Sequence, residues 1–464
     1  MSEKKTTSRR EFLQTSGTAA AVVSAATIVP SSVLGRAFGH TAPSDKLNVA
    51  AIGAGGMGSG NTDRCARTDN IYALCDVDWA RAAGQFEKYP NAKKYKDFRK
   101  MLDKEKSIDA CIIASPDHTH AVAAMAAMKL KKHVYVQKPL THSVYEARIL
   151  TETARKYGVA SQMGNQGHSG PGCRNIKDWI SAGVIGKIDL LECWTNRPIW
   201  PQGVTTRPPK QAVPDTLAWD LWLGPAKWRE YNQAYVPQSW RAYKDFGTGA
   251  LGDMACHIMD SGFFSLDLKY PTSVEGCTSR DIGTVEGGRW GGPVKNDETY
   301  PRSSLITYKF PARGDHPPCT VKWYDGGLVP TKPDIVDPNI KLPTSGSIFH
   351  GEKGIIICNE YGVNPVVYPL EAAETAKAAP QTVERIKDGE DGHETNWLEA
   401  CKGGKPASSN FDYSGPMTEM VLMGNLATIF PMQKIMWDGP NYKVTNIPEA
   451  NDWINPPYRE GWSL

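Results

Sequence analysis

Asp253 and His257 lie four positions apart and could move a proton together. If this segment is helical, the spacing places a carboxylate and an imidazole on the same face of the helix. Histidine suits proton transfer because its unperturbed pKa lies nearer neutrality than that of any other side chain. The alternative is a buried histidine whose ring is satisfied by a backbone carbonyl. The spacing alone leaves both interpretations open.

A glycine-rich turn in the first quarter of the chain could hold a phosphate. Residues 46–52 form an apolar stretch that predicts a strand, and it runs directly into the sequence GAGGMG at positions 53–58. In this G-x-G-x-x-G pattern the glycines allow a tight turn, and the helix that follows directs free N–H groups at a pyrophosphate. The pattern therefore predicts a dinucleotide site that includes Gly53, Gly55, Met57 and Gly58.

An acidic residue follows the next predicted strand. The apolar residues 71–75 end in Asp76, which is 18 residues beyond Gly58. A carboxylate at this point accepts hydrogen bonds from both ribose hydroxyls and repels the 2′-phosphate of NADP. The predicted cofactor is therefore NAD. Arg81 is near enough in sequence to keep NADP as the second choice, and FAD is a further alternative.

Predicted strands and helices alternate through the first part of the chain. Residues 108–114, 133–136 and 159–163 read as buried strands, and residues 95–103 and 120–129 read as helices. In an open α/β sheet the carboxyl ends of the strands face the ligand crevice. Two polar clusters that follow these strands are therefore expected to contact the cofactor: Ser115, Pro116, His118 and His120 after the first, and Gln137 and Lys138 after the second.

Together these motifs resemble the Gfo/Idh/MocA family of NAD(P)-dependent sugar and polyol oxidoreductases. The resemblance includes the glycine motif, Asp76, the polar cluster that begins at Ser115, and the pair Lys138-Pro139, which is similar to the family's Glu-Lys-Pro signature. Gln137 stands where the family usually has Glu. This departure removes a carboxylate beside the lysine.

The resemblance continues in the second half of the chain, through positions 240–241 and the sequence DFGTGALGDMACH at positions 245–257. It implies that Lys138 lies near the nicotinamide and the reacting hydroxyl, and that Asp253 and His257 complete the catalytic site. We expect His257 to take the hydroxyl proton and Lys138 to polarise the developing carbonyl oxygen, with Asp253 positioning the substrate or the imidazole. Lys138 is the alternative base, because burial can lower the pKa of a lysine into range.

Two stretches suggest where a substrate would bind. Positions 164–170 are polar and flexible at the predicted domain junction, and clefts between domains are favoured binding sites. Residues 197–240 hold five of the 14 tryptophans. Tryptophan rings can stack on the C–H faces of a sugar, although packing of the loop onto the sheet is the more ordinary role for any single tryptophan. The candidate substrate contacts are Asn165, Gln166, His168, Trp240 and Arg241.

The predicted architecture has two domains. Residues 45–165 form an α/β Rossmann domain with a doubly wound parallel sheet, and residues 166–464 form an α+β substrate and oligomerisation domain with a large, mostly antiparallel open sheet. Such a sheet could pair face to face, so we expect a homo-oligomer. The ten cysteines are scattered without a CxxC pair, so most are expected to be packing thiols, and no metal site is predicted.

Residues 1–40 resemble a twin-arginine export signal, because the sequence SRREFL at positions 8–13 precedes an uncharged run rich in Ala, Ser and Thr. The expected location is the periplasm, with a membrane tether if the signal is not cleaved, and the expected partner is the twin-arginine export machinery. A disordered tail with a chance arginine pair is the alternative. The formal net charge of +3 matches the five basic and two acidic residues of this stretch. The neutral remainder argues against nucleic-acid binding.

The function expected from these features is an exported oxidoreductase that transfers hydride between a tightly bound NAD(P) and a secondary alcohol of a sugar or sugar-like substrate. Outside the cytoplasm there is no supply of free NAD, so the cofactor must be reset in place. One alternative is a redox-neutral NAD-dependent glycosidase or lyase that acts through a transient keto-sugar. The other is a non-catalytic sugar-binding protein.

Overall fold

The computed structural model describes residues 45–283 and 292–464. The export signal predicted over residues 1–40 lies outside this part of the chain. Leu47–Leu464 form one unit that contains both predicted sheets. Within the described residues, no helix is long and apolar enough to cross a membrane.

The first sheet has six strands in the order β3-β2-β1-β4-β5-β6, and every neighbouring pair is parallel. The strands are β1 (Asn48–Ile52), β2 (Asn70–Cys75), β3 (Lys93–Tyr95), β4 (Ala110–Ile113), β5 (His133–Gln137) and β6 (Ser161–Gly164). This arrangement confirms the predicted Rossmann fold. The strands at its centre are almost entirely buried, which explains their continuous apolar sequences.

Helices connect the parallel strands, as crossover connections require. They are α3 (Met57–Cys65), α4 (Trp79–Lys88), α5 (Phe98–Lys104), α6 (Asp117–Lys129) and α7 (Val144–Tyr157). The helix expected over residues 95–103 begins later, because Tyr95 ends β3 and the side chain of Asp97 accepts a hydrogen bond from the backbone N–H of Arg99 at the start of α5.

The second sheet has nine strands in the order β15-β14-β13-β7-β12-β11-β8-β16-β17. Only β12 and β7 run parallel among its pairs, so the prediction of a mostly antiparallel sheet is confirmed. The strands are β7 (Ile188–Trp194), β8 (Ser273–Thr278), β11 (Ser304–Phe310), β12 (Cys319–Tyr324), β13 (Gly346–Gly351), β14 (Gly354–Asn359), β15 (Val366–Tyr368), β16 (Lys434–Asp438) and β17 (Lys443–Val444). A separate two-stranded ribbon pairs β9 (Ile282–Gly283) with β10 (Gly292–Pro293).

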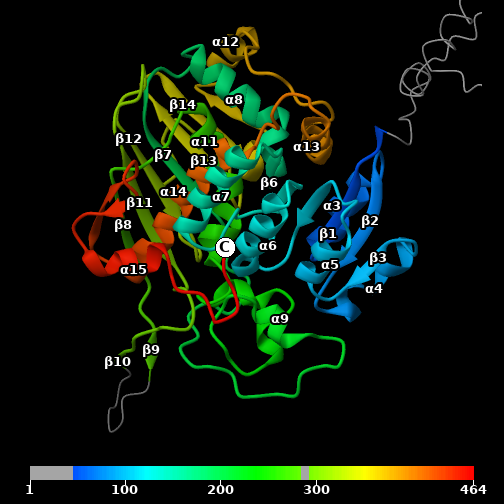
Figure 1. Cartoon of the computed structure of the whole chain (residues 1–464). Coiled ribbons are helices and arrows are strands. Elements are labelled where there is room, and N and C mark those ends of the chain that lie inside the picture. Colours follow the sequence, from blue (N-terminus) through cyan, green and yellow to red (C-terminus); the bar gives the residue numbers. More distant parts are fainter. Residues whose placement is uncertain (1–44, 284–291) are drawn as a thin grey trace, which may run out of the picture. The chain divides into compact units, whose positions relative to one another are not determined.

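Helices pack on the nine-stranded sheet and join it to the first domain (Figure 1). These are α8 (Pro171–Ser181), α10 (Gly249–Ile258), α11 (Asp260–Ser265) and α14 (Phe411–Ile429), and the smaller α12 (Ala372–Ala378) and α15 (Asn451–Ile454) lie near the sheet edges. Helix α14 packs against both α7 and β8. One continuous hydrophobic cluster therefore spans the two domains.

Helix α13 (His393–Cys401) returns to the first domain from late in the chain. Its Trp397 and Leu398 belong to the same buried cluster as Val49 and Leu74 of the parallel sheet. Residues near 400 therefore complete the core of the Rossmann domain. The domain boundary predicted after residue 165 assigns this helix to the second domain, whereas it packs in the core of the first.

Residues 195–248 form a long connection between β7 and α10, here called the cap segment. It contains the short helix α9 (Trp219–Leu223) and builds its own apolar cluster, so most of its tryptophans serve packing. The members of this cluster include Leu217, Trp219, Trp222, Tyr231, Tyr235, Trp240, Tyr243 and Phe246.

The cysteines have the packing role that their sequence context predicts. Eight of the ten are buried, Cys277 is exposed and Cys401 is half-buried. Cys75 and Cys111 lie inside the parallel strands β2 and β4. Burial raises the pKa of both thiols, so they remain neutral and unreactive.

Candidate active site

The glycine loop forms a cradle between β1 and α3. Gly53 has a φ of 84°, and a Cβ there would lie 2.6 Å from the backbone of Ala114. A Cβ on Gly58 would lie 1.8 Å from the carbonyl oxygen of Gly53. Helix α3 has no side-chain cap, so no side chain competes with a ligand for the N–H groups of its first turn, of which that of Ser59 donates to the carbonyl of Gly56 at 3.2 Å. These features fit the diphosphate of a dinucleotide.

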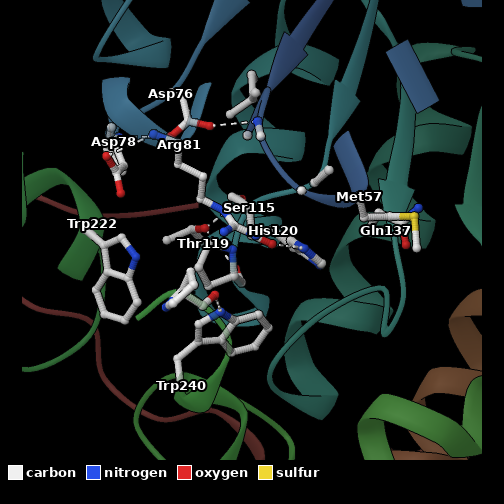
Figure 2. A pocket seen from close by; sticks show the side chains of 18 of the residues that line it. Met57, Asp76, Asp78, Arg81, Ser115, Thr119, His120, Gln137, Trp222 and Trp240 are labelled. Carbon is white, nitrogen blue, oxygen red and sulfur yellow. Dashed lines mark hydrogen bonds between the residues drawn. The ribbon is translucent and has the colours of Figure 1, made fainter. Parts of the chain in front are cut away.

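Asp76 occupies the end of β2, as the sequence predicts. One carboxylate oxygen accepts a hydrogen bond from the N–H of Gly55 at 3.0 Å, and the other accepts from Asp78 at 2.9 Å (Figure 2). Burial raises the pKa of Asp76, and these backbone hydrogen bonds oppose that shift. Each oxygen keeps a further lone pair for a ribose hydroxyl.

A cavity of about 390 Å³ runs from Asp76 to Lys138 between the parallel sheet and the cap segment. Figure 2 shows Asp76, Asp78 and Arg81 at one end and Met57 and Gln137 at the other, with Trp222 and Trp240 reaching in from the cap segment. The predicted contacts that line this cavity are Gly53, Gly55, Met57, Asp76, Ser115, Pro116, His120, Gln137, Lys138, Trp240 and Arg241.

His118 and His120 connect the segments around the cavity through hydrogen bonds to backbone carbonyl groups. The ring nitrogens of His120 lie 2.7 Å from the carbonyl oxygen of Ser115 and 2.9 Å from that of Pro139, so this residue links the ends of β4 and β5. His118 does not line the cavity. Its ring nitrogens lie 3.1 Å from the carbonyl oxygen of Phe246 and 3.0 Å from that of Trp222, so it joins α6 to the cap segment.

Lys138, Asp253 and Arg241 form a charged cluster beside the cavity. The ammonium group of Lys138 donates to the main-chain carbonyl of Asp253 at 2.7 Å and to its carboxylate at 2.9 Å. Nε of Arg241 donates to the same carboxylate oxygen at 2.9 Å. Burial acts to raise the pKa of Asp253, but the charges of Lys138 and Arg241 dominate and lower it. Asp253 therefore remains ionised and positions two cations.

His257 follows one turn later on α10 and is buried. Burial lowers its pKa well below the usual value, and the charge of Lys138 lowers it further, so the imidazole is neutral. Its Nδ1 is buried and has no hydrogen-bond partner in the described part of the chain. The interpretation as a histidine satisfied by a backbone carbonyl therefore does not fit this nitrogen. Nε2 is the atom left to exchange a proton with a ligand.

Tyr361 is a site residue that the sequence did not reveal. Its ring packs edge-on against His257 with the ring centroids 4.5 Å apart, and its φ of 64° is unusual for a residue other than glycine. Burial, together with the nearby charges of Glu360 and Asp253, raises the pKa of the phenol to about 12, so it stays protonated. No local motif marks Tyr361, because it follows β14, about a hundred positions from His257.

Three of the five candidate substrate contacts, Asn165, Gln166 and His168, lie near the domain junction and away from the cavity. Asn165 is fully buried, its Oδ1 accepts from Ser409 at 2.6 Å, and its Nδ2 has no partner within the described residues. His168 is also buried, with Nδ1 3.1 Å from Asp260. Gln166 is half-buried in the short 3-10 helix between them. None of the three lines the cavity, in contrast to Trp240 and Arg241.

The ligand atoms of His168, Cys173 and Asp260 lie within 4.8 Å of one another, which is close enough to share a metal ion. Protein groups already fill much of this space. His168 bonds to Asp260, and the hydroxyl of Tyr413 donates to the same carboxylate at 2.5 Å. Arg174 carries a positive charge beside the group. These contacts explain the cluster without a metal.

Fold and site together define a two-domain protein. Its first domain has a dinucleotide cradle, and Lys138 of that domain lies close to Asp253 and His257 of the second. Comparisons with known proteins agree. Residues 47–165 match the NAD-binding Rossmann fold of the oxidoreductase family GFO_IDH_MocA. Residues 174–281 match the C-terminal alpha/beta domain of the same family. The chain belongs to the Gfo/Idh/MocA family, and its first domain is the NAD-binding domain.

Curated relatives include the myo-inositol 2-dehydrogenase of Thermotoga maritima, which is 27% identical over 157 residues, 33% of this chain and 47% of the relative. The D-glucoside 3-dehydrogenase of Escherichia coli is 30% identical over 257 residues, 53% of this chain and 63% of the relative. The chain spans about half the length of the first of these curated relatives.

Solved structures share the fold at low identity. The WlbA dehydrogenase from Bordetella pertussis, in complex with NADH and UDP-GlcNAcA, gives a TM-score of 0.57 at 14% identity and covers 85% of this chain and 99% of its own. A levoglucosan dehydrogenase in complex with NADH gives 0.56 at 17% identity and covers 84% of this chain and 99% of its own. At these identities the comparison establishes the fold alone.

Proposed function

We propose that the protein is an exported oxidoreductase that transfers hydride between a tightly held NAD and a secondary alcohol of a sugar or sugar-like substrate. The observation that carries the proposal is the geometry of Lys138, which spends two of its three N–H donors on Asp253 and keeps one. A neutral His257 lies close by on α10. The names of the relatives, which include inositol, levoglucosan and glucoside dehydrogenases, support a cyclic polyol as substrate.

Lys138, His257 and Asp253 have separate roles in the proposed alcohol oxidation. NAD, when bound, supplies the acceptor for the hydrogen that leaves the carbinol carbon. Lys138 donates its remaining N–H to the substrate oxygen and stabilises negative charge as it develops there. His257 takes the hydroxyl proton at Nε2, because its neutral ring has a free lone pair. Asp253 holds Lys138 in place through the ion pair.

Main-chain contacts at the Asp76 end of the cavity support a tightly held cofactor. The N–H of Ala218 donates to the carbonyl of Val77 at 2.9 Å, and the N–H of Trp79 donates to the carbonyl of Thr216 at 3.2 Å. These bonds form a crossing between the cap segment and the loop after β2, whose Val77 and Asp78 line the cavity. A dinucleotide bound there leaves only when this crossing opens.

A second crossing lies on the other side of the cap segment. Arg459 donates to the carboxylate of Asp220 at 2.6 Å, which fixes the final residues against α9. Three positions later, Trp462 lies against Phe98 of α5 with the ring centroids 6.2 Å apart, and the guanidinium of Arg99 lies 4.3 Å above its ring. Residues 459–462 therefore connect the cap segment to the Rossmann domain near Phe98, which lines the cavity.

A retained cofactor bears on the reaction type. After one oxidation the reduced cofactor must return its hydride before the next turnover. A second carbonyl substrate can accept it, which makes the protein a sugar–sugar oxidoreductase. The same sugar can also take it back after a neighbouring glycosidic group has been eliminated, which makes the protein a redox-neutral glycosidase or lyase. The two crossings favour a cofactor that stays bound, and both reaction types use one.

Retention is tested by counting nucleotides. Protein is purified from its native host, dialysed at length and denatured, and the released nucleotide is identified and measured per chain. Wild type is expected to keep NAD, whereas Trp462→Ala loses it during dialysis. Trp453→Ala is the matched control, since this exposed tryptophan on α15 lies outside the cavity. Wild-type protein that neither holds nor binds NAD would overturn the catalytic proposal and leave a sugar-binding protein.

Reaction type is tested with the same holoprotein and a panel of sugars and glycosides. Lasting reduced nicotinamide with free sugars supports an oxidoreductase that awaits a second substrate. Cleavage of a glycoside with no net change in nicotinamide absorbance supports the redox-neutral reaction. Export is tested separately, by cell fractionation of the Arg9→Lys and Arg10→Lys double variant, which is expected to stay inside the cytoplasm. Periplasmic accumulation of that variant would contradict the twin-arginine route.

A further inference from the structure

Three buried polar side chains form a chain of hydrogen bonds behind Lys138. Nδ2 of Asn61, on α3, donates to Oε1 of Glu394, on α13, at 2.6 Å. Nε2 of Gln137, at the end of β5, donates to Oδ1 of Asn61 at 2.9 Å. All three side chains are at least nine-tenths buried. The chain connects a helix from late in the sequence to the residue that precedes Lys138.

The order of donors in this chain follows from the carboxylate. Oε1 of Glu394 acts as an acceptor, because Arg64 and the hydroxyl of Tyr135 also direct donors at it, so Asn61 turns its NH₂ group toward it. The oxygen of Asn61 then faces Gln137 and can only accept, so Gln137 must turn its own NH₂ group inward. The remaining atom of the Gln137 amide, Oε1, is therefore directed away from Asn61.

Gln137 lines the cavity beside Lys138, and its Oε1 has no hydrogen-bond donor among residues 45–283 and 292–464. Figure 2 shows Gln137 and Met57 at the end of the cavity away from Asp76. Because Asp76 marks the adenosine ribose, this opposite end is where the nicotinamide ring belongs. An acceptor oxygen there matches the NH₂ group of the nicotinamide carboxamide.

We propose that Glu394 is a positioning residue for the cofactor, which acts through Asn61 to make Gln137 present an acceptor oxygen to the nicotinamide carboxamide. This inference rests on the proposed function, since it assumes that NAD occupies the cavity. It also accounts for the Gln at position 137, where the family signature has Glu. In this chain the carboxylate of the group lies on α13, and an amide relay carries its orienting effect to the cavity.

The surroundings of Glu394 support a role that packing alone does not require. Its second oxygen, Oε2, is buried without a hydrogen-bond partner in the described residues, which is a costly arrangement for a merely structural side chain. Arg64 lies 3.5 Å from Oε1, and the hydroxyl of Tyr135 lies at the same distance. Arg64 and Tyr135 are both hydrogen-bond donors. They therefore favour an acceptor oxygen of residue 394, and not an NH₂ group, at the position that faces Asn61.

The first test uses three probes that compete with the resident nucleotide: NAD, its acetylpyridine analogue, in which a methyl ketone replaces the carboxamide, and ADP-ribose. Wild type is expected to bind NAD about fivefold more tightly than the analogue, the effect of one net hydrogen bond. In Glu394→Leu the ratio falls to about one while the affinity for ADP-ribose is unchanged. Glu399→Gln, an exposed position on the same helix, is the control and keeps the wild-type ratio.

The second test measures thermal unfolding and needs no nucleotide. Gln137→Glu places a carboxylate on each side of Asn61, whose single NH₂ group satisfies only one of them, so this variant is expected to melt below wild type. The double variant Gln137→Glu/Glu394→Gln reverses every donor in the chain and leaves each paired. It is therefore expected to recover part of the loss, although an NH₂ group then faces Arg64 and Tyr135, and this recovery is a coupling that independent sites do not give.

The outcomes separate the two proposals. A wild-type ratio of NAD to analogue that persists in Glu394→Leu, or additive melting shifts in the double variant, would overturn the role of Glu394. Failure of wild type to bind ADP-ribose would instead overturn the proposed function, because that probe lacks the nicotinamide and reports the Asp76 end alone.

Discussion

Lys138 and Asp253 are joined at two points, since the ammonium group contacts both the main-chain carbonyl and the carboxylate of the aspartate, at 2.7 and 2.9 Å. This double contact fixes the direction of the lysine side chain more tightly than a single ion pair does. It leaves one N–H of Lys138 for the substrate. The catalytic account depends on that remaining donor.

Replacement of Asp253 is expected to weaken catalysis more than folding. Asp253→Asn keeps the shape and the main-chain contact but removes the negative charge that two cations share, so kcat falls by about tenfold to a hundredfold. Steady-state kinetics with a reactive sugar checks this, with Asp189→Asn, an exposed position on β7, as the control. Unchanged kcat would show that the carboxylate does not support Lys138.

The same carboxylate contributes stability that depends on pH. Because the folded-state pKa of Asp253 is lowered, its contribution is complete above the unfolded pKa of about 3.9 and is lost only as pH falls through the lower folded value. The stability difference between wild type and Asp253→Asn should therefore stay constant from neutral pH down to about pH 4. A difference that shrinks between neutrality and that point would contradict the pairing.

His257 as the base predicts a particular pH profile. His257→Gln is expected to lower kcat by roughly a hundredfold to ten-thousandfold. In wild type, burial and then the charge of Lys138 lower the pKa of the imidazole, so it remains neutral and active through the range in which a free histidine is protonated. The profile of kcat/KM should show no acid limb near pH 6.5, the approximate value for an exposed histidine. A limb there would assign the base to a group in ordinary surroundings.

Asp76 should control the choice between NAD and NADP. Asp76→Ser removes the acceptor for the ribose hydroxyls and the charge that repels a 2′-phosphate, and Arg81 lies against the same glycine loop. We expect NAD affinity to fall by about tenfold to a hundredfold and NADP affinity to rise. Titration with both nucleotides checks this, and Asp103→Asn, exposed on α5, should bind as wild type does. Equal loss of both nucleotides would mean that Asp76 only maintains the loop.

Alanine substitutions at Gly58, in α3, and at Gly84, in α4, test the close packing of the glycine loop through protein stability. A Cβ at Gly58 would meet the carbonyl oxygen of Gly53 at 1.8 Å, so Gly58→Ala should destabilise the protein by about 1–3 kcal/mol. Gly84, inside α4, has no atom within 4 Å of its Cβ position, so Gly84→Ala should stabilise it by about 0.5–1 kcal/mol. Denaturant unfolding measures both, and shifts of the same sign would contradict the close approach at Gly58.

Much of the first domain was predictable because its signals are local. The sequence marked five of its six strands, and the glycine motif and Asp76 gave the cofactor site. Strand β3 was missed, since its three residues begin with two exposed lysines and carry no apolar run. In the second sheet, β11 and β12 show the alternation that reflects one buried face, whereas β14 is buried at four successive positions.

The placement of the other site residues depends on contacts between segments that are far apart in the sequence. His118 follows β4 as cofactor-binding residues do, but its ring is taken up by carbonyl groups of the cap segment. Glu394 reaches Asn61 across 333 positions, and no pattern in α13 marks it. Tyr361 contacts His257 only because the short 3-10 helix after β14, Glu360–Gly362, packs against α10 in the folded second domain. Such placements follow from packing and could not be read from spacing.

The central claim is that this site oxidises a carbinol with its own resident NAD. The most direct measurement is a rapid-mixing experiment in which native holoprotein meets excess sugar, and absorbance in the band of reduced nicotinamide is followed through one turnover. Wild type should give a rise equal to the NAD content, slowed when the carbinol carbon carries deuterium and abolished in His257→Gln. A holoprotein that contains NAD, yet gives neither an absorbance change nor an isotope effect with any sugar or glycoside, would contradict the account.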